Sequence, residues 1–273
     1  KRITELEKKV AQSTNELEQL SSKLLKAESL RSSFLSHILN EVNNPLTSIL
    51  GLINGIVSMA HSNPELVHKQ ANMAFEEAFE LDYNMRNIFA AAGIEAGTLS
   101  VQPGKVDVSH LLDSILQGID FKTKRKNLKI ERKENNERND FFHTDPSMLR
   151  AMLLNLVGNA IEFSAPRRFI KIDLDIGNEG IVFSITDCGP GITEEHQKLI
   201  FSRFKQLDEG VTKTHPGTGL GLSIVKEYTD LLGGSLDVKS QLGKGTTFTL
   251  VLPDISKDNE ALAEVSFSEE ELF

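Results

Sequence analysis

Hydrophobic residues in the first part of the chain recur at helical spacing. Residues 1–28 place apolar side chains at heptad positions, with weak points at Ser13 and Ala27: Ile3, Leu6, Val10, Leu17, Leu20 and Leu24. A heptad stripe between polar positions is typical of a parallel coiled coil, which buries the stripe against a second helix. A single amphipathic surface helix is the alternative. We expect the coiled coil, which implies a homodimer.

The helical pattern continues over residues 29–97 and predicts a hairpin of two helices. Pro45 should kink the first helix, because proline removes a backbone hydrogen bond. A break at residues 61–64 precedes a second helix of about Pro64–Ala92, which we expect to end at Gly93 and Gly97. Two such hairpins would form a dimeric four-helix bundle. The inward-facing positions of the second helix are predicted to be Val67, Ala71, Ala74, Ala78, Leu81, Met85, Ile88 and Phe89.

Residues 98–253 alternate between helical and strand periodicity, which predicts an α/β sandwich. The expected elements are a helix from a cap at Ser109 through Ile119, a strand at Leu128–Glu131, a helix capped by Asp145 through about Ser164, strands at Phe169–Ile176 and Gly180–Asp187, a helix from Thr218 to about Leu232, and strands at Ser235–Ser240 and Thr246–Leu252. In the first long strand, alternation puts Ile170, Ile172, Leu174 and Ile176 on one face. The predicted fold class of the whole chain is therefore α+β. Residues 254–273 are acidic and predict a tail or linker.

Composition narrows the class of protein. The 273 residues are 39% hydrophobic and 25% charged, which suits one or two globular domains. A net charge of −9 argues against nucleic-acid binding, and the basic cluster at residues 122–126 is expected to be a solvated face. Cys188 is the single cysteine, so no internal disulfide forms and a reducing compartment is favoured. No apolar run approaches the roughly 18–20 residues that span a bilayer, so we expect a cytoplasmic fragment of a longer protein without membrane contact.

The second half of the chain contains four motifs in a fixed order. They are Asn155–Ala160 (NLVGNA), Asp187–Ile192 (DCGPGI), Phe201–Phe204 (FSRF) and Gly217–Leu222 (GTGLGL), followed by a glycine turn at Gly243–Thr246. In this order they resemble the N box, first glycine box, F box and second glycine box of the ATP-binding domain of histidine kinases, gyrase, Hsp90 and MutL proteins. Each motif alone is weak, but four in order beside a helical hairpin are specific. The chain thus resembles the core of a sensor histidine kinase.

The resemblance implies ATP and Mg²⁺ as ligands of this domain. It assigns the adenine amine to Asp187, Mg²⁺ to the amide oxygen of Asn155, and the phosphates or the metal shell to Asn159. An amide oxygen suits Mg²⁺, a hard cation that prefers oxygen ligands and keeps bound waters. Gly189 and Gly191 would let the backbone approach the base.

The second glycine box should contact the triphosphate. Gly217, Thr218, Gly219, Leu220 and Gly221 open a helix whose N-terminal amides can face phosphate, and Arg203 is a further candidate contact. Residues 205–216 would form a mobile lid, with Phe201 and Phe204 either in its packing or in the core.

One residue of the N box departs from the family pattern. Glu162 stands where many relatives carry a phosphate-binding lysine. A carboxylate there would repel the triphosphate by roughly 1–4 kcal/mol at about 4 Å. Lys213, Arg203 or Mg²⁺ could offset this repulsion, or Glu162 could turn into solvent.

Residues 34–47 resemble the phosphoacceptor segment of the same family, with a different residue at its centre. In the family, the reactive histidine is followed by an acid and stands five residues before a proline. Counted back from Pro45, that position is Asn40, followed by Glu41, while His37 lies three residues too early. A neutral imidazole can attack a phosphorus atom, whereas an amide nitrogen is not basic. The sequence therefore predicts that Asn40 abolishes autophosphorylation.

Three functions remain open for such a chain. The first is a histidine kinase core whose acceptor was replaced, naturally or by design. The second is a degenerate kinase that works as a scaffold by binding the receiver domain of a response regulator or another histidine kinase. The third is a phosphatase of the receiver aspartyl phosphate, since Glu41 and Asn44 keep the family spacing and an Asn44 amide could orient a water.

Overall fold

The computed structural model describes residues 14, 21, 39–59, 63–136, 141–177, 180–202 and 219–255. The chain divides into two compact units, Lys1–Asn84 and Met85–Phe273. Apart from Thr14 and Ser21, the predicted coiled coil lies outside the described residues, as does the tail beyond Ile255.

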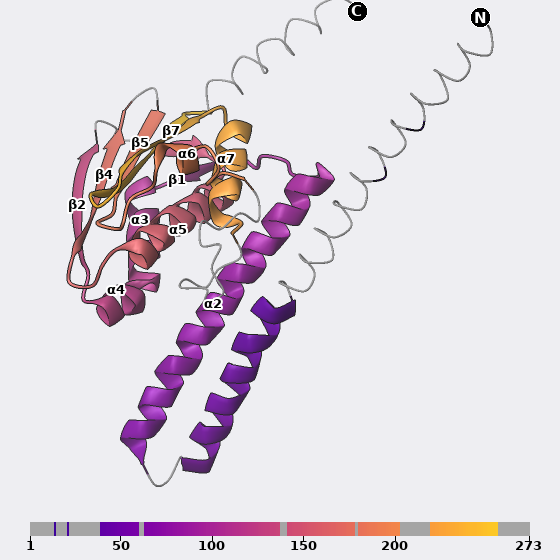
Figure 1. Ribbon diagram of the computed structural model, residues 1–273, viewed down its shortest axis with the longest axis vertical. Coiled ribbons are helices and arrows are strands. Elements are labelled where there is room, and N and C mark those ends of the chain that lie inside the picture. The colour runs from indigo at the N-terminus through magenta and orange to yellow at the C-terminus, as the bar shows by residue number, and fades with distance from the viewer. Residues whose placement is uncertain are drawn as a thin grey trace, which may run out of the picture. The chain divides into compact units, whose positions relative to one another are not determined.

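The predicted helical hairpin begins in the first unit, and the last residues of its second helix, from Met85 on, are assigned to the second unit. Residues 39–59 are helical through Pro45, and α2 spans Pro64–Ala96 beside them (Figure 1). The Asn63 side chain caps the start of α2 by accepting a hydrogen bond from the Leu66 amide at 3.1 Å. The two helices are joined by a bond of 3.2 Å from Asn84 Nδ2 to Glu41 Oε2.

The C-terminal end of α2 differs from the prediction at two positions. Gly93 lies inside the helix, which ends only where Gly97 adopts a left-handed conformation with φ 63°. A glycine within a helix costs only about 1 kcal/mol, whereas the left-handed cap is what stops the helix. Phe89 was predicted to face inward but is 65% exposed, because the neighbouring Ile88 and the residue three positions on, Ala91, define the buried face.

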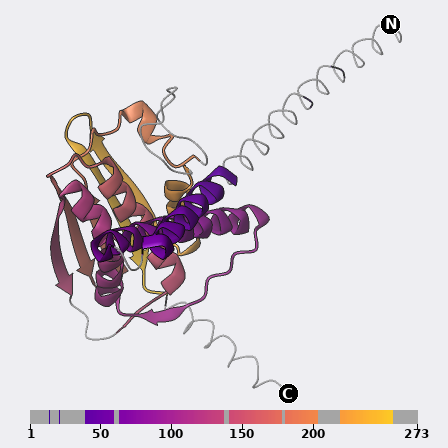
Figure 2. The same ribbon diagram turned by 90° about the horizontal axis from the view of Figure 1, so that it is seen from below.

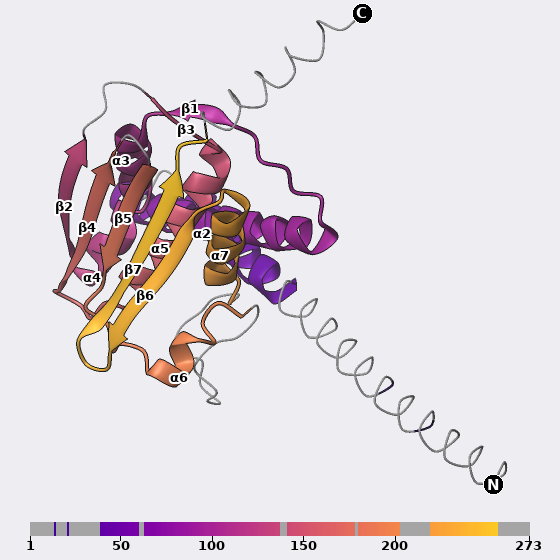
Figure 3. The same ribbon diagram turned by 90° about the horizontal axis from the view of Figure 1, so that it is seen from above.

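A five-stranded sheet forms one layer of the second unit. Its strand order is β2-β4-β5-β7-β6, with β2 and β4 parallel and the other neighbours antiparallel (Figure 3). The strands are β2 (Lys129–Asn136), β4 (Phe169–Ile176), β5 (Gly180–Thr186), β6 (Ser235–Gln241) and β7 (Gly245–Pro253). A separate antiparallel pair joins β1 (Gly104–Val106) to β3 (Phe142–Thr144).

Helices cover one face of this sheet, as the views in Figures 1 and 3 show for α3, α5 and α7. The helices of the unit are α3 (Val108–Gly118), α4 (Asp120–Lys126), α5 (Pro146–Phe163), α6 (Glu194–Gln197) and α7 (Gly221–Leu231). Along β4, the predicted alternation is confirmed, because Ile170, Ile172, Leu174 and Ile176 are all buried. On the helical side of the core, Met152, Leu153 and Leu156 of α5 are fully buried. The predicted α/β sandwich is thus confirmed, while the coiled coil and the dimer stay predictions.

The two main helices begin at aspartate caps. Asp145 caps α5 as predicted, with its Oδ1 accepting from the amides of Ser147 at 2.9 Å and Met148 at 3.0 Å. The cap of α3 is Asp107, which accepts from the His110 amide at 2.9 Å, so the prediction of Ser109 was wrong. The Ser109 hydroxyl is instead bonded to Glu134 on β2. Both residue types cap helices well, and the extended backbone at Asp107 decides between them.

Candidate functional site

Asp187 is a buried carboxylate directly after β5. Only 5% of it is exposed, and its Oδ1 accepts backbone hydrogen bonds from Gly189 at 2.8 Å and from Thr246 of β7 at 3.1 Å. The Asp187 amide in turn donates to the Thr246 carbonyl at 2.8 Å. Both described bonds to the side chain use Oδ1, and each carboxylate oxygen can accept further bonds. An ionised carboxylate can only accept, which matches an N–H donor such as an exocyclic amine.

Two opposing effects set the charge of Asp187. Burial raises the pKa of Asp187 above its ordinary value of 3.8, and the bonds from Gly189 and Thr246 lower it again by a smaller amount. Burial is the larger effect, because water is removed from around the charged form. The protein therefore holds this carboxylate in an unfavourable place, which is typical of a group that serves a ligand.

Glycines bring two loops close to Asp187. Gly245 has φ 95°, and a Cβ atom there would lie 2.1 Å from the Asp187 carbonyl oxygen. Gly191 has φ 74°, and a Cβ atom would lie 2.1 Å from the Gln241 carbonyl oxygen. At Gly189 a Cβ atom would come within 2.8 Å of Asp187 Oδ1. At all three glycines, the missing side chain lets the loop lie against other parts of the protein, mostly backbone carbonyls. Figures 2 and 3 both show the β6–β7 turn beside the segment that leads to α6.

Asn155 lies fully buried on α5, bonded to a residue that the sequence did not single out. Its Nδ2 donates to the Ala151 carbonyl at 2.9 Å and to Asn87 Oδ1 at 3.0 Å, while Asn87 Nδ2 donates to Asn155 Oδ1 at 3.2 Å. Asn87, on α2, is itself only 4% exposed. Asn87 was not among the predicted site residues, although it lies four positions before Ala91 and so shares the buried face of the helix.

The second glycine box brings the start of α7 against Asn155. Gly219 is left-handed with φ 68°, Leu220 is buried, and a Cβ atom on Gly221 would lie 2.3 Å from Asn155 Oδ1. The free amides at a helix N-terminus favour anions such as phosphate. The predicted contacts Arg203, Gly217 and Thr218 lie outside the described residues, as do Phe204, Lys213 and the expected lid.

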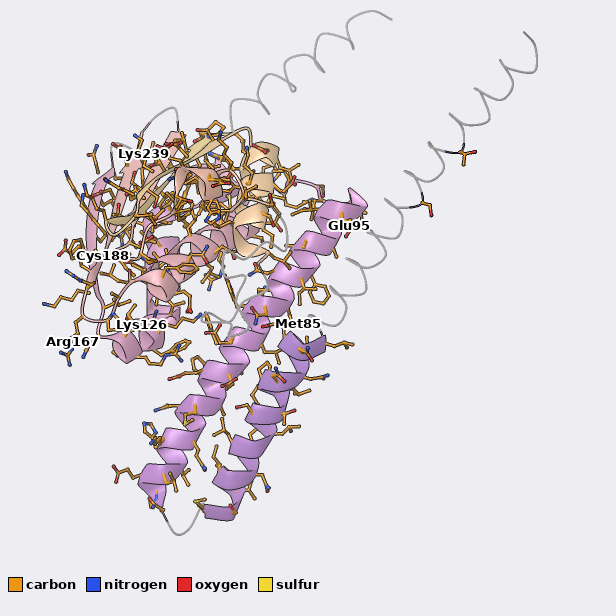
Figure 4. All side chains as sticks on the ribbon, in the orientation of Figure 1. Met85, Glu95, Lys126, Arg167, Cys188 and Lys239 are labelled. Atoms are coloured by element: carbon orange, nitrogen blue, oxygen red, sulfur yellow. The ribbon has the colours of Figure 1, made fainter. Side chains whose placement is uncertain are left out.

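Lys126 lies at the C-terminal end of α5, and not on a solvated face as predicted. Lys126, at the end of α4, donates from its Nζ to the backbone carbonyls of Ile161 and Glu162 and is half-buried (labelled in Figure 4). The prediction that the whole basic cluster is a solvated face is therefore wrong for Lys126. A lysine is stabilising there, because carbonyls at a helix C-terminus carry partial negative charge. Asn159 and Glu162 are both half-buried.

The donor chemistry of these groups fits Mg-ATP. Among the described residues, no three His, Cys, Asp or Glu side chains gather as a metal cluster. Mg²⁺ does not need such a cluster, since it is held by one or two protein oxygens, waters and substrate phosphates. An amide oxygen of Asn155 beside the α7 N-terminus is an arrangement of this type, and the Asp187 carboxylate suits the base.

The candidate residues of the hairpin lie on one helix near its described start. Asn40 and Asn44 are both exposed and stand four positions apart, so they share a face. Glu41 is half-buried and bonded to Asn84, as described above. His37 lies outside the described residues.

Residues 144–256 match a protein-family model described as histidine kinase-, DNA gyrase B- and HSP90-like ATPase. The chain is 29% identical over 251 residues to the circadian input-output histidine kinase CikA of Synechococcus elongatus, covering 91% of this chain and 33% of CikA. It is also 29% identical over 226 residues to the sensor protein SrrB of Staphylococcus aureus, covering 83% of this chain and 38% of SrrB. The chain thus spans about a third of the length of these relatives.

Solved structures share the fold. Full-length ShkA in complex with AMPPNP has a TM-score of 0.57 at 21% identity, over 84% of this chain and 45% of that one. The Acinetobacter baumannii histidine kinase AdeS has a TM-score of 0.53 at 21% identity, over 79% of this chain and 98% of that one.

In a third structure, the histidine kinase ThkA in complex with the response regulator TrrA, the TM-score is 0.51 at 23% identity, over 84% of this chain and 63% of that one.

Within the part that the structure describes, no helix is long and apolar enough to cross a bilayer. Residues 144–256 therefore carry a domain of the histidine kinase-, DNA gyrase B- and HSP90-like ATPase type, and most of the chain is similar to proteins named as sensor histidine kinases.

Proposed function

We propose that this chain binds Mg-ATP as the catalytic core of a two-component histidine kinase and that it lacks the phosphoacceptor. The observation that carries the proposal is the buried amide of Asn155 against the N-terminus of α7, and the buried carboxylate of Asp187 in the same unit supports it. In this proposal, ATP is recognised through its adenine and provides the phosphoryl group for transfer.

Each residue has a separate role in binding. Asp187 accepts the adenine amine through its carboxylate, which Gly189 and Thr246 hold in place. The first amides of α7 face the phosphates, and Asn155 holds Mg²⁺ through its amide oxygen. Asn159, one turn along α5, supports the same end of the ligand.

Asn40 determines what such a core can do. The exposed amide is in the acceptor position and cannot attack a phosphorus atom. In this proposal the chain is a cytoplasmic homodimer, joined through the coiled coil and hairpin, and it acts on a response-regulator receiver domain or on another histidine kinase by binding. The ThkA–TrrA complex of the comparison supports a response regulator as the kind of partner.

Calorimetric titration with ATP in Mg²⁺ tests the proposal. We expect one site per chain in the parent protein and none in Asp187→Ala, which removes the acceptor without adding volume at this buried position. Phe141→Leu, an exposed position on β3's flank, is the matched control and should bind as the parent does. No heat of binding from a folded parent would contradict the proposal.

A second candidate activity is hydrolysis of the aspartyl phosphate of a receiver domain. It is favoured by the exposure of Asn44 and by the bond that holds Glu41 to Asn84. In this reaction, a water oriented by the Asn44 amide attacks the phosphorus. The bond from phosphorus to the aspartyl oxygen breaks, and the products are the carboxylate and inorganic phosphate.

The phosphatase candidate is tested on a phosphorylated cognate receiver domain. We expect the parent chain to accelerate loss of phosphate and Asn44→Ala to lose the acceleration. Asn43→Ala changes an adjacent exposed amide on another helix face and should keep it. Equal decay with and without the parent chain would rule this activity out.

A further inference from the structure

Four cations gather at one end of the second unit, where α4 and β2 meet the loop before β4. They are exposed, and within the described residues their side chains have no hydrogen-bond or ion-pair partner: Arg125, Lys129, Arg167 and Arg168. The Arg167 amide donates to the Lys126 carbonyl at 3.0 Å, and Figure 4 shows these two residues close together. The Lys129 amide donates to the Arg168 carbonyl, also at 3.0 Å. Backbone bonds therefore hold the four cations, which we call the basic patch, at one place on the surface.

The basic patch stands out in a chain with a net charge of −9. Neighbouring like charges repel one another, and an anionic partner removes this repulsion. Lys124 of the same helix already has such a partner, since it forms an ion pair with Asp120. Arg167 also has a left-handed backbone with φ 62°, which is uncommon for a residue with a side chain. The basic patch therefore has the charge to bind an anionic group.

Two exposed aromatic rings flank the arginines of the basic patch along the chain. Phe163, at the end of α5, is 43% exposed, and Phe169, at the start of β4, is 41% exposed. Apolar side chains that gather in one exposed area mark interaction surfaces, whereas single ones are ordinary. A partner that covers the rings and the cations must carry apolar side chains and carboxylates together. This is the chemistry of an acidic peptide with apolar residues.

The chain contains such a peptide in its acidic tail. Residues 256–273 hold six acidic residues and one lysine, and residues 267–273 read FSEEELF. Three glutamates thus stand between Phe267 and the pair Leu272–Phe273, just as the two arginines stand between two exposed phenylalanines. We propose that residues 267–273 dock on the basic patch of the same chain. In this contact the glutamates pair with the cations, and the apolar residues at both ends cover the exposed rings.

The connecting chain is long enough for this contact. β7 leads to Ile255, and Pro253 of β7 lies opposite Gly180, at the end of the sheet where β4 finishes. The basic patch lies near the start of β4, about 25 Å away along a strand of eight residues. The twelve residues from Ile255 to Phe267 extend to about 40 Å. This reach exceeds the length of the strand, so the contact can form within one chain.

The basic patch borders the segment that carries Asp187. The Cys188 amide donates to Ser164 Oγ at 3.3 Å, and a Cβ atom on Gly189 would lie 2.8 Å from the Phe163 carbonyl oxygen. The docked peptide thus lies beside the candidate nucleotide site. The docking itself requires no nucleotide, so it can be tested apart from the proposed function.

Paramagnetic relaxation in the full chain, without nucleotide, tests the docking. A nitroxide is attached through Ser266→Cys in a Cys188→Ser background, and amide signals are compared before and after its reduction. We expect the signals of residues 163–169 to lose most of their intensity while the nitroxide is paramagnetic. Arg167→Glu with Arg168→Glu should restore the signals, because the reversed charges repel the glutamates. Lys239→Glu changes an exposed cation of β6, labelled in Figure 4, and should leave the loss as in the parent.

The remaining outcomes separate docking within one chain from its alternatives. Full intensity at residues 163–169 in the parent would overturn the proposal, as would a loss that persists in the double variant. In a mixture of isotope-labelled chains without nitroxide and nitroxide-bearing chains without isotope, we expect full intensity. A loss there would mean that the peptide docks on a second copy, which overturns docking within one chain.

Salt provides a second test if the double variant fails to fold. In about 1 M salt the Debye length is about 3 Å, so the attraction between glutamates and cations is screened. The loss of intensity in the parent should shrink under this condition. An unchanged loss would overturn the contact between the glutamates and the basic patch.

Discussion

At the scale of single residues, the charge that Asp187 needs for binding is opposed by its burial. Its carboxylate must stay ionised to accept a ligand amine, yet burial raises its pKa and so disfavours the charged form. The backbone amides of Gly189 and Thr246 resolve part of the conflict by bonding one oxygen. Oδ1 therefore serves the fold, while the carboxylate keeps the capacity to accept a bond from a ligand.

This division of roles predicts a change of base preference in Asp187→Asn. The Asn oxygen must take the place of Oδ1, since two backbone amides point at it, and this turns the Asn nitrogen toward the ligand. A donor would then meet the donor amine of adenine. We expect the affinity for ATP to fall by tenfold or more, and inosine triphosphate, which carries a carbonyl at that position, to lose less. Competition with a fluorescent nucleotide measures both, and an equal loss for the two nucleotides would contradict the assignment.

The same variant predicts a pH dependence of stability. Because the pKa of Asp187 is raised in the folded state, its protonated form favours folding below the unfolded value of 3.8, and this contribution is lost as pH rises through the folded pKa. Asp187→Asn lacks this loss. The melting temperature of the variant minus that of the parent should therefore be larger at pH 7 than near pH 4. A difference that shrinks as pH rises would show that the hydrogen bonds, and not burial, dominate.

At the scale of elements, two capping aspartates of unequal burial start α3 and α5. Asp107 is exposed, and its side chain makes one described bond, which it accepts from the His110 amide. Asp145 is 3% exposed, caps α5 through Oδ1 and accepts from the Gln102 amide at 2.8 Å through Oδ2. Asp145 thus joins the chain before β1 to the helix that carries Asn155.

Alanine at the two caps should cost different amounts. Asp107→Ala removes one exposed cap and should lower the free energy of unfolding by about 1 kcal/mol. Asp145→Ala also strands the Gln102 amide, so we expect a loss of about 2–3 kcal/mol. Urea unfolding of both variants beside the parent measures the difference, and equal losses would mean that the second bond of Asp145 contributes nothing.

Sequence patterns predicted these elements to different degrees, for physical reasons. The faces of β4 were predictable because only one side of the sheet is covered, so Ile170 and Ile172 had to share it. The cap of α3 was missed because two capping residues stand two positions apart. The Asn87–Asn155 pair could not be predicted, since it joins residues 68 positions apart and depends on tertiary packing. Lys126 was missed because a lysine stem can be buried while its charge meets helix carbonyls.

At the scale of the whole molecule, the hairpin leaves a stripe of apolar side chains exposed in the single chain. On the helix of residues 39–59, the stripe runs at spacings of four and three residues: Leu46 (43%), Leu50 (60%), Ile53 (46%) and Val57 (71%). Such spacing is typical of a coiled-coil seam. Ala71 and Ala78 of α2, which were predicted to face inward, are also exposed in the single chain. The prediction was for a four-helix bundle, which would bury more of each helix than one hairpin does.

This stripe predicts a homodimer that a single charge disrupts. We expect the parent to sediment as a dimer and Leu50→Glu to shift toward the monomer, because a buried carboxylate in an apolar seam is costly. Leu242→Glu, at a similarly exposed leucine of the β6–β7 turn (62%), should remain a dimer. A monomeric parent, or a Leu50→Glu variant that is as dimeric as the parent, would contradict the four-helix bundle.

The proposed function combines a competent ATP site with the lack of a nucleophile at position 40. The most direct measurement is incorporation of phosphate from γ-labelled Mg-ATP, with the parent chain and Asn40→His side by side. We expect no label on the parent and label on Asn40→His, since an imidazole beside Glu41 restores the nucleophile. Label on the parent would contradict the assignment of Asn40 as the acceptor position, and two unlabelled proteins would contradict a competent ATP site.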